Sequence, residues 1–305
     1  GLFSICMKHI LSICLLLISL VNIVAQTRVE RIINEIKNPK SKYVLVALHR
    51  GDWRHYPENS LEGIESSINM GGDIIEIDLA LSADSVLVLS HDRTIDRATT
   101  GKGLISELPY DSLKQVFLRD EYGNPTKFKM PTLREALNLC RDRIIVNVDK
   151  GYQYFELLQK LARELGVENQ ILLKGKSPVA DVAAKFAETG SKMMYMPIID
   201  ILVPKGKDLF NEYKSVSQVP LAYEVCWDKM TPDVTDCFDY IVLSGSKLWV
   251  NTLWDSLNGG LTDDKAFNGD PEDVYGQLLK MGATMIQTDR PEFLLEYLRK
   301  KGLHD

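Results

Sequence analysis

Strand-length apolar runs alternate with segments of helical periodicity along most of this chain of 305 residues, and this alternation strongly constrains the fold. Most of the runs are continuously apolar, which is typical of parallel strands covered on both faces. Strands and helices that alternate in this way favour a parallel sheet closed into a barrel. We therefore predict an α/β fold with a single (β/α)8 TIM barrel, an architecture that needs roughly 250 residues.

Nine segments are predicted to be strands, one more than a closed barrel of eight requires. They are residues 43–48, 73–79, 144–149, 170–174, 193–198, 219–225, 240–243, 248–253 and 284–288. We interpret residues 240–243 and 248–253 as one barrel position and its extension. Helices are expected at residues 60–70, 133–140, 154–165, 178–188, 207–215, 271–281 and 291–300. A small insertion is expected after the second strand, with a short strand at 86–89, a short helix at 111–117 and a turn at 120–125.

The first 25 residues are predicted to be a secretory signal peptide, with residues 1–6 as an upstream extension. Met7-Lys8-His9 precedes an apolar run that is short for a membrane-spanning helix, and Ala25 is a candidate cleavage position. The domain would then span residues 26–305 in a secreted or periplasmic location, without stable membrane insertion. An uncleaved membrane anchor is the alternative. Residues 27–38 predict a surface helix that leads into the barrel.

Charge and cysteine content narrow the classes of function. The net charge is −6 and the pI is about 5.5, so no sequence-wide basic field draws the chain to nucleic acid. Three cysteines follow the signal segment, Cys140, Cys226 and Cys237, and their irregular spacing predicts neither a disulfide framework nor a zinc site. Buried thiols are expected, and a Cys226–Cys237 disulfide is the alternative in an oxidising compartment.

Paired acids on the second predicted strand are candidates for a metal site. Glu76 and Asp78 are two residues apart, so both carboxylates point to one face of the strand. Carboxylate oxygens suit a divalent cation, and unpaired buried acids are costly. Asp149 ends the third strand and offers a third ligand. The alternatives are acids that face helix N-termini or solvent and, for Asp149, an acid that caps the following turn.

Two histidines at predicted strand ends flank this acidic strand. The imidazoles of His49 and His91 suit general acid–base catalysis because their ordinary pKa lies near neutrality. A lone histidine is more often structural, but two on either side of the acidic strand favour a catalytic pair. Arg50 offers a planar fork of donors for phosphate oxygens. Asn59 either orients a ligand or closes the loop.

Four segments together resemble the glycerophosphodiester phosphodiesterase family: HRGDWRHYPENS, EIDLALSADSVLVLSHD, MPTLREAL and IQTDRPEFLLEYL. They lie in the family's order and spacing, and the resemblance covers residues 43–303. It implies a (β/α)8 barrel, one divalent cation (Ca²⁺ or Mg²⁺), and hydrolysis of small-molecule glycerophosphodiesters to sn-glycerol 3-phosphate and an alcohol. In this family pattern the nucleophile is the substrate's own 2-hydroxyl, which gives a cyclic phosphate that water then opens.

The resemblance also implies roles for individual residues. The general acid and base would be His49 and His91, the phosphate ligand Arg50, and the metal ligands Glu76, Asp78 and Asp149, the last where glutamate is commoner. The family's lysine stands two residues after that acid, whereas here Lys150 follows it directly, so that its side chain points to the opposite face. Lys174 either replaces the missing charge or is a solvated strand-end lysine. Trp249 either walls the substrate pocket or packs in the core.

Two rival functions fit parts of the sequence. A related barrel phospholipase acting on phosphoinositide- or sphingomyelin-type head groups would expose an apolar rim, and no membrane-docking helix follows the signal segment. A non-catalytic periplasmic protein that binds phosphodiesters would not need two proton-transfer groups. Residues 255–270 are expected to be a loop that overhangs the pocket, with solvated acids.

Overall fold

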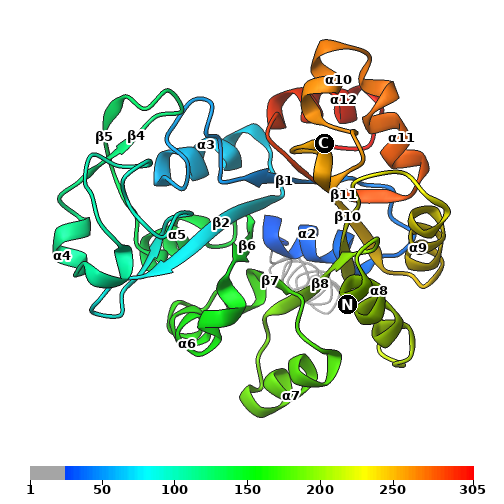
Figure 1. Ribbon diagram of the computed structural model, residues 1–305, viewed down its shortest axis with the longest axis horizontal. Helices are drawn as coiled ribbons and strands as arrows, with labels where there is room; N and C mark the ends of the chain where they lie inside the picture. The colour runs from blue at the N-terminus through cyan, green and yellow to red at the C-terminus, as the bar shows by residue number, and fades with distance from the viewer. Residues whose placement is uncertain (1–24) are drawn as a thin grey trace, which may run out of the picture.

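A computed structural model describes residues 25–305 and confirms the predicted barrel (Figure 1). The predicted signal segment lies, but for Ala25, outside the described residues. The barrel strands are β1 (Leu45–His49), β2 (Ile74–Leu81), β6 (Ile145–Asp149), β7 (Ile171–Gly175), β8 (Met194–Asp200), β9 (Ala222–Cys226), β10 (Lys247–Asn251) and β11 (Ala283–Thr288). Neighbouring strands are parallel, and β1 pairs with both β2 and β11, so the sheet closes on itself.

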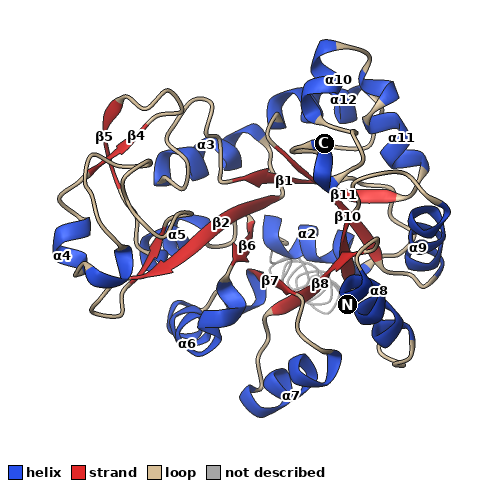
Figure 2. Cartoon of the chain, in the orientation of Figure 1, coloured by secondary structure: helices blue, strands red, loops and turns tan. Residues whose placement is uncertain are grey.

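The helices that connect these strands lie around the outside of the barrel (Figure 2). They are α3 (Leu61–Met70), α5 (Leu133–Cys140), α6 (Phe155–Leu165), α7 (Val179–Thr189), α8 (Pro204–Lys214), α9 (Pro232–Leu243), α10 (Asp263–Asn268), α11 (Tyr275–Lys280) and α12 (Pro291–Lys300). Short 3-10 turns precede or follow several of them, namely η2 (Gly151–Tyr154), η3 (Glu168–Gln170), η4 (Asp255–Leu257) and η5 (Pro271–Asp273). None of the helices formed by residues 25–305 is long and apolar enough to cross a membrane.

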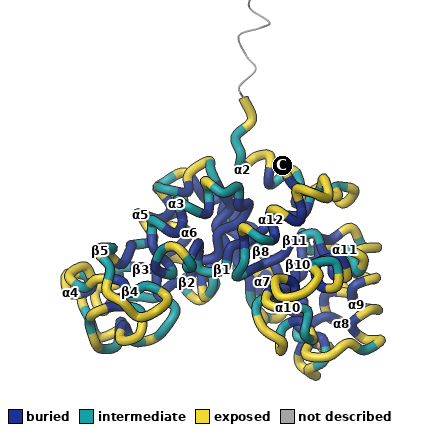
Figure 3. The backbone as a smooth tube through the Cα atoms, turned by 90° about the horizontal axis from the view of Figure 1, so that it is seen from above, coloured by how far each residue is buried: buried dark blue, intermediate teal, exposed yellow. Residues whose placement is uncertain are grey.

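The helix α2 (Arg28–Lys37) closes the barrel at the end where the strands begin. Its N-cap is Thr27, which forms a capping box with Glu30. Val29, Ile32 and Ile36 pack inside the barrel against the first residues of the strands, in a cluster that also contains Leu45, Ile74, Ile145, Met194, Ala222 and Met285. Figure 3 shows this helix at one edge of the molecule and shows the buried residues concentrated in the middle of the molecule.

The predicted insertion follows β2 and has its own small core. It contains β3 (Leu87–Leu89), which pairs with the end of β2, then η1 (Ile105–Glu107), α4 (Tyr110–Leu113) and the antiparallel pair β4 (Phe117–Arg119) and β5 (Pro125–Lys129). Its apolar residues cluster apart from the barrel core, and they are Val88, Ile95, Ile105, Leu113, Leu118 and Met130. In Figure 1 the insertion lies to the left, beside the strand β2.

Several sequence predictions were wrong in detail. Residues 240–243 are the end of α9 rather than a strand, because Val234, Phe238 and Ile241 continue a helical stripe that is buried on one side. The loop predicted at 255–270 contains η4 and α10, and the helix predicted at 271–281 is broken into η5 and α11. The alternative Cys226–Cys237 disulfide does not form, and all three described cysteines are buried free thiols.

Candidate active site

The strand ends place the predicted site residues on one rim of the barrel. His49 ends β1 and lies opposite Glu76 on β2, and Asp78 lies opposite Asp149 at the end of β6. Carboxyl ends of parallel strands meet at one face of a barrel, so these four side chains come from a shared edge.

The three predicted acids form one compact cluster. A carboxylate oxygen from each of Glu76, Asp78 and Asp149 lies within 4.8 Å of the others. Burial, and then the charge of Asp78, raise the pKa of Glu76 to about 8. Three carboxylates at such short range repel one another unless a cation or a proton lies between them. An all-oxygen donor set of this charge suits a hard divalent cation, so the residues present fit the kind of ion that the family resemblance implies.

The loop after β1 holds this cluster in place. Asn59 Nδ2 donates to Asp78 Oδ2 at 2.9 Å, and Asn59 Oδ1 accepts from the Asp78 backbone N–H at 3.0 Å. The Arg50 backbone N–H donates to Glu76 Oε2 at 3.0 Å. Arg50 and Gly51 both have positive φ, and a Cβ at Gly51 would stand 3.3 Å from the backbone carbon of Gly63. The tight turn is therefore what brings the Arg50 amide to the acids.

The two histidines are each oriented by a carboxylate. His49 Nδ1 donates to Asp289 Oδ1 at 2.8 Å, and Trp53 Nε1 donates to the same oxygen at 2.8 Å. His91 Nδ1 donates to Asp92 Oδ1 at 2.8 Å. With Nδ1 engaged in this way, Nε2 of each ring is the nitrogen that takes no part in the bond to the aspartate. Burial lowers the pKa of His49, but Asp289 and Glu76 raise it more, so the net pKa lies above its ordinary value.

The Arg50 guanidinium lies between two acids. Its Nη1 is 3.5 Å from Glu58 Oε2 and its Nε is 3.5 Å from Asp78 Oδ2. Arg50 Nε is buried and makes no hydrogen bond among the described residues. A planar donor group in this position, beside Glu58 and Asp78 and next in sequence to His49, can bind phosphate oxygens.

The two predicted lysines lie in different environments. Lys150 is exposed, with a positive φ, and its Nζ donates to the backbone oxygen of His91 at 2.7 Å. Lys174 is buried, with its Nζ 3.6 Å from Glu224 Oε1. Burial lowers the pKa of Lys174, but Glu224 and the site acids raise it more, so its net pKa lies above the ordinary value. Lys174 on β7 is therefore not a solvated strand-end lysine, because its side chain is buried among acids.

Trp249 lies inside the barrel rather than at its mouth. It is fully buried in the same apolar cluster as α2, and its Nε1 donates to Asn251 Oδ1 at 2.9 Å. The Lys174 ammonium lies 5.7 Å from the centre of its ring. The indoles that line the open pocket belong instead to Trp53 and Trp254.

The pocket lined by these indoles has a volume of about 530 Å³ and extends from His49 to the insertion. His49, Arg50 and Asp289 line its inner part, and residues 119–123 of the β4–β5 hairpin line its outer part. A larger groove of about 910 Å³ between α3 and α5 contains none of the predicted site residues. The smaller pocket therefore includes two of the predicted site residues, His49 and Arg50, and part of its wall comes from the insertion.

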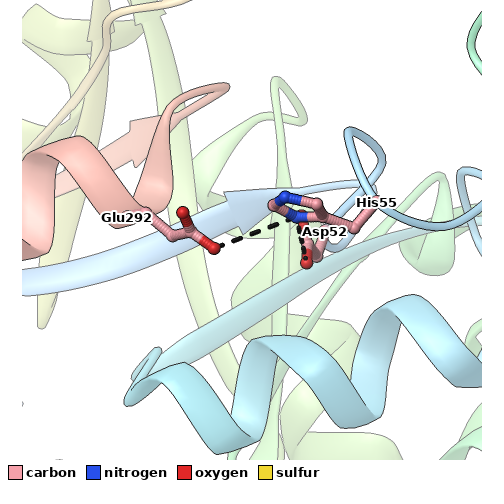
Figure 4. A group of neighbouring side chains, drawn as sticks. All are labelled: Asp52, His55 and Glu292. Carbon is pink, nitrogen blue, oxygen red and sulfur yellow. Dashed lines mark hydrogen bonds and ion pairs between the residues drawn. The ribbon is translucent and has the colours of Figure 1, made fainter.

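A second group of possible metal ligands lies outside this pocket (Figure 4). The His55 imidazole stands between Asp52 and Glu292, with Nδ1 3.0 Å from Asp52 Oδ1 and 3.8 Å from Glu292 Oε1. Ser66 also donates to Asp52 at 2.6 Å. His55 is half exposed, and its bond to Asp52 raises its pKa. These contacts are ion pairs and a hydrogen bond that hold the loop before α3 in place.

Sequence reasoning missed the acids that orient the histidines. Asp289 follows the last strand in the segment TDRP, and its place directly after a strand end was the available signal. Asp263 was predicted to be solvated but is buried at the start of α10, because it accepts hydrogen bonds from Thr252, Tyr275 and Thr288 and from the Asp289 backbone N–H. It thereby fixes the backbone of the acid that holds His49.

Comparison with known proteins gives a consistent result. Residues 49–217 match the model of the glycerophosphoryl diester phosphodiesterase family, and residues 195–298 match a domain of unknown function. The chain is 32% identical over 268 residues to a glycerophosphodiester phosphodiesterase of Caldanaerobacter subterraneus, covering 85% of this chain and 99% of that protein. A cattle glycerophosphodiester phosphodiesterase 1 is 34% identical over 129 residues, covering 39% of this chain and 38% of that protein.

Solved structures agree with the fold. A glycerophosphoryl diester phosphodiesterase from Parabacteroides distasonis matches with a TM-score of 0.74 and 26% identity, covering 90% of this chain and 92% of that one. An Oleispira antarctica phosphodiesterase, solved in complex with sn-glycerol-3-phosphate, matches with a TM-score of 0.62 and 18% identity, covering 84% of this chain and 97% of that one. Because the family model covers more than half of the sequence and one relative matches along nearly its whole length, this chain belongs to the glycerophosphoryl diester phosphodiesterase family of enzymes.

Proposed function

We propose that this enzyme hydrolyses glycerophosphodiesters to sn-glycerol 3-phosphate and an alcohol, with His49 and His91 as general acid and base. The observation that carries the proposal is the pairing of each imidazole with an aspartate beside a cluster of three carboxylates. A protein that only binds phosphodiesters has no need of two oriented proton-transfer groups.

Glu76, Asp78 and Asp149 would hold one divalent cation, Ca²⁺ or Mg²⁺. Such a cation, when bound, supplies positive charge that polarises the phosphate and stabilises charge developing on its oxygens. Arg50 would bind the phosphate, and the buried Lys174 ammonium group would add positive charge near the acids. Lys150 holds the His91 backbone rather than the substrate.

The proton transfers follow from the orientation of the rings. One histidine takes the proton of the glycerol 2-hydroxyl through Nε2, and that oxygen attacks phosphorus. The other histidine, protonated, gives its proton to the leaving alkoxide, so the alcohol departs and a cyclic phosphate remains. Water then opens the ring with the two roles exchanged, which releases sn-glycerol 3-phosphate and restores both histidines.

The experiment measures glycerol 3-phosphate released from glycerophosphocholine, glycerophosphoethanolamine and glycerophosphoinositol, with Ca²⁺, with Mg²⁺ and with chelator. We expect metal-dependent release that Glu76→Gln, His49→Ala and His91→Ala each abolish. Glu164→Gln is the matched control for Glu76→Gln, since Glu164 pairs with Arg134 on the outer helices, away from the site. Near wild-type turnover in both catalytic histidine variants would contradict the assignment.

We also propose that the enzyme works in a secreted or periplasmic location after removal of a signal peptide. The apolar run at the start of the sequence supports this, as does the position of the first domain helix, which begins at Arg28. N-terminal sequencing of the protein from fractionated cells tests the proposal. A mature terminus near residue 26 in the non-cytoplasmic fraction is expected, and a full-length chain in the cytoplasm would contradict it.

A further inference from the structure

Arg97, in the loop of the insertion between β3 and η1, joins two acids that come from different parts of the chain. Its Nη2 and Nη1 donate to Glu58 Oε1 at 2.7 Å and to Glu58 Oε2 at 3.0 Å. Its Nε donates to Asp92 Oδ2 at 2.8 Å, and its Nη2 lies 3.3 Å from Asp92 Oδ1. One guanidinium group therefore makes four contacts to two carboxylates.

Each of these carboxylates in turn contacts a residue of the proposed site. Asp92 Oδ1 accepts from His91 Nδ1 at 2.8 Å, so it sets the orientation of that ring. Glu58 Oε2 lies 3.5 Å from Arg50 Nη1, so it sets the position of the phosphate-binding group. A continuous set of contacts thus runs from His91 to Arg50 through Arg97, although Arg97 itself is no part of the acidic cluster.

Charge and geometry favour an arginine at this position. Burial raises the pKa of Glu58, but Arg97 and Arg50 lower it more, and the hydrogen bond from Arg97 is the main cause that lowers the pKa of Asp92 to about 2. Both acids are therefore ionised at neutral pH. A guanidinium fork can serve two carboxylates at once, whereas a lysine ammonium is a compact charge that cannot reproduce the planar pairing.

The backbone that carries Arg97 is fixed to the insertion. Arg119 N donates to the Ala98 backbone oxygen at 2.8 Å, and the Arg119 side chain donates to the Thr99 backbone oxygen at 2.8 Å. The β4–β5 hairpin thereby holds the loop that carries the guanidinium group. The insertion then contributes to the site through its hold on Arg97 as well as through the outer wall of the pocket.

We propose that Arg97 is a positioning residue for the hydrolysis, which holds His91 and Arg50 in a fixed relation to one another. The inference rests on the proposed function, because it assigns both residues to that reaction. His91 acts only in the transition state, so loss of Arg97 lowers kcat. Arg50 contacts the phosphate in both the bound substrate and the transition state, so KM rises as well.

The test compares Arg97→Ala, Arg97→Lys and the control Arg93→Ala in the glycerol 3-phosphate assay. Arg93 lies in the same loop, is exposed, and makes no side-chain hydrogen bond or ion pair within the described residues. We expect kcat/KM to fall by about 10- to 100-fold in Arg97→Ala, with kcat carrying most of the loss. Arg97→Lys restores only part of the activity, and Arg93→Ala matches the wild type.

Chemical rescue separates positioning from a general effect on folding. The Arg97 side chain is half exposed, so a guanidinium ion at a concentration far below the denaturing range can reach its place. We expect a saturable recovery of kcat/KM in Arg97→Ala and no change in the wild type or in Arg93→Ala. Should Arg97→Ala not fold, Glu58→Gln tests the same contact, and it should lower kcat/KM without any response to guanidinium.

The outcomes distinguish failure of the role given to Arg97 from failure of the proposed function. If the wild type is active and the kcat/KM of Arg97→Ala is within about twofold of the wild-type value, the inference alone is overturned. A change that small is below the usual effect of losing such a contact. A folded, impaired Arg97→Ala that guanidinium does not restore also overturns it. Absence of release by the wild type itself overturns the proposed function first, and the inference with it.

Discussion

Replacing Asp289 by asparagine removes the charge beside His49 while the size of the side chain stays the same. Asp289 Oδ1 accepts from both His49 Nδ1 and Trp53 Nε1 at 2.8 Å. An amide oxygen in that place can accept both bonds, so we expect the imidazole to keep its orientation. The variant therefore isolates the effect of charge from the effect of geometry.

The magnitude follows from the two kinds of hydrogen bond. A bond to a charged group contributes about 1.5–3 kcal/mol and a neutral bond about 0.5–1.5 kcal/mol. Loss of the charge should therefore remove about 1.4 kcal/mol of transition-state stabilisation, which is about tenfold in kcat/KM. Burial lowers the pKa of His49, whereas its hydrogen bond to the Asp289 carboxylate and the charges of Glu76 and Asp289 raise it. Asp289→Asn keeps an acceptor for the hydrogen bond but removes the carboxylate charge, so the pKa of His49 should fall.

The assay is glycerol 3-phosphate release across the pH range in which histidine titrates. Asp289→Asn should show the loss in kcat/KM and a shift of one limb of the pH profile to lower pH. Asp264→Asn is the matched control, because this exposed acid on α10 pairs with Arg290 and does not contact His49. Wild-type kcat/KM together with an unmoved limb in Asp289→Asn would refute the role given to this charge.

Three further predictions concern stability. Ca²⁺ or Mg²⁺ at 100 times its Kd should raise the free energy of unfolding by about 2.7 kcal/mol in the wild type but not in Glu76→Gln, as measured by urea denaturation. Asp263→Ala should lower the free energy of unfolding by at least about 3 kcal/mol, because four hydrogen bonds to this buried carboxylate are lost and each unsatisfied donor costs about 1–3 kcal/mol. Burial lowers the pKa of His304, but Asp73 raises it more, so the net pKa lies above the ordinary value. The ion pair therefore stabilises the fold below about pH 6.5 and loses that contribution as pH rises through the folded pKa, a dependence that should disappear in His304→Gln.

Each of these predictions has a result that would contradict it. Equal stabilisation of wild type and Glu76→Gln by the cation would place the metal elsewhere. An Asp263→Ala variant as stable as the wild type would mean that water replaces the carboxylate without cost. A stability profile that is unchanged in His304→Gln would show that other groups cause the pH dependence.

Local pattern was enough to predict the barrel, because continuous apolar runs and helix caps mark each element in turn. It failed at residues 240–243, where a short apolar run fits a buried helix end as well as a strand. The deciding feature was the helical stripe that begins at Val234, which is visible only over a longer window.

The candidate site was predictable only in part. The strand period placed Glu76 and Asp78 on one face, and the strand ends placed His49 near them. The partners of the histidines depend on closure of the barrel, since Asp289 is 240 residues from His49 in sequence. Arg97 and Asp263 were missed for a similar reason. Each is a charged residue in a polar segment, and only the folded chain shows what it contacts.

The position of α2 at the bottom of the barrel also determines where a tag, a surface linker or a fusion partner can be joined to the enzyme. Thr27, the N-cap of α2, lies at the end where the strands begin, whereas the pocket opens at the end where they finish. Figure 3 shows α2 at the top edge of the molecule and the hairpin strand β4 lower down, toward the left. A purification tag, a linker to a surface or a fused partner joined before Thr27 therefore starts on the far side from the substrate, and an enzyme immobilised through this end presents its open pocket to the solution.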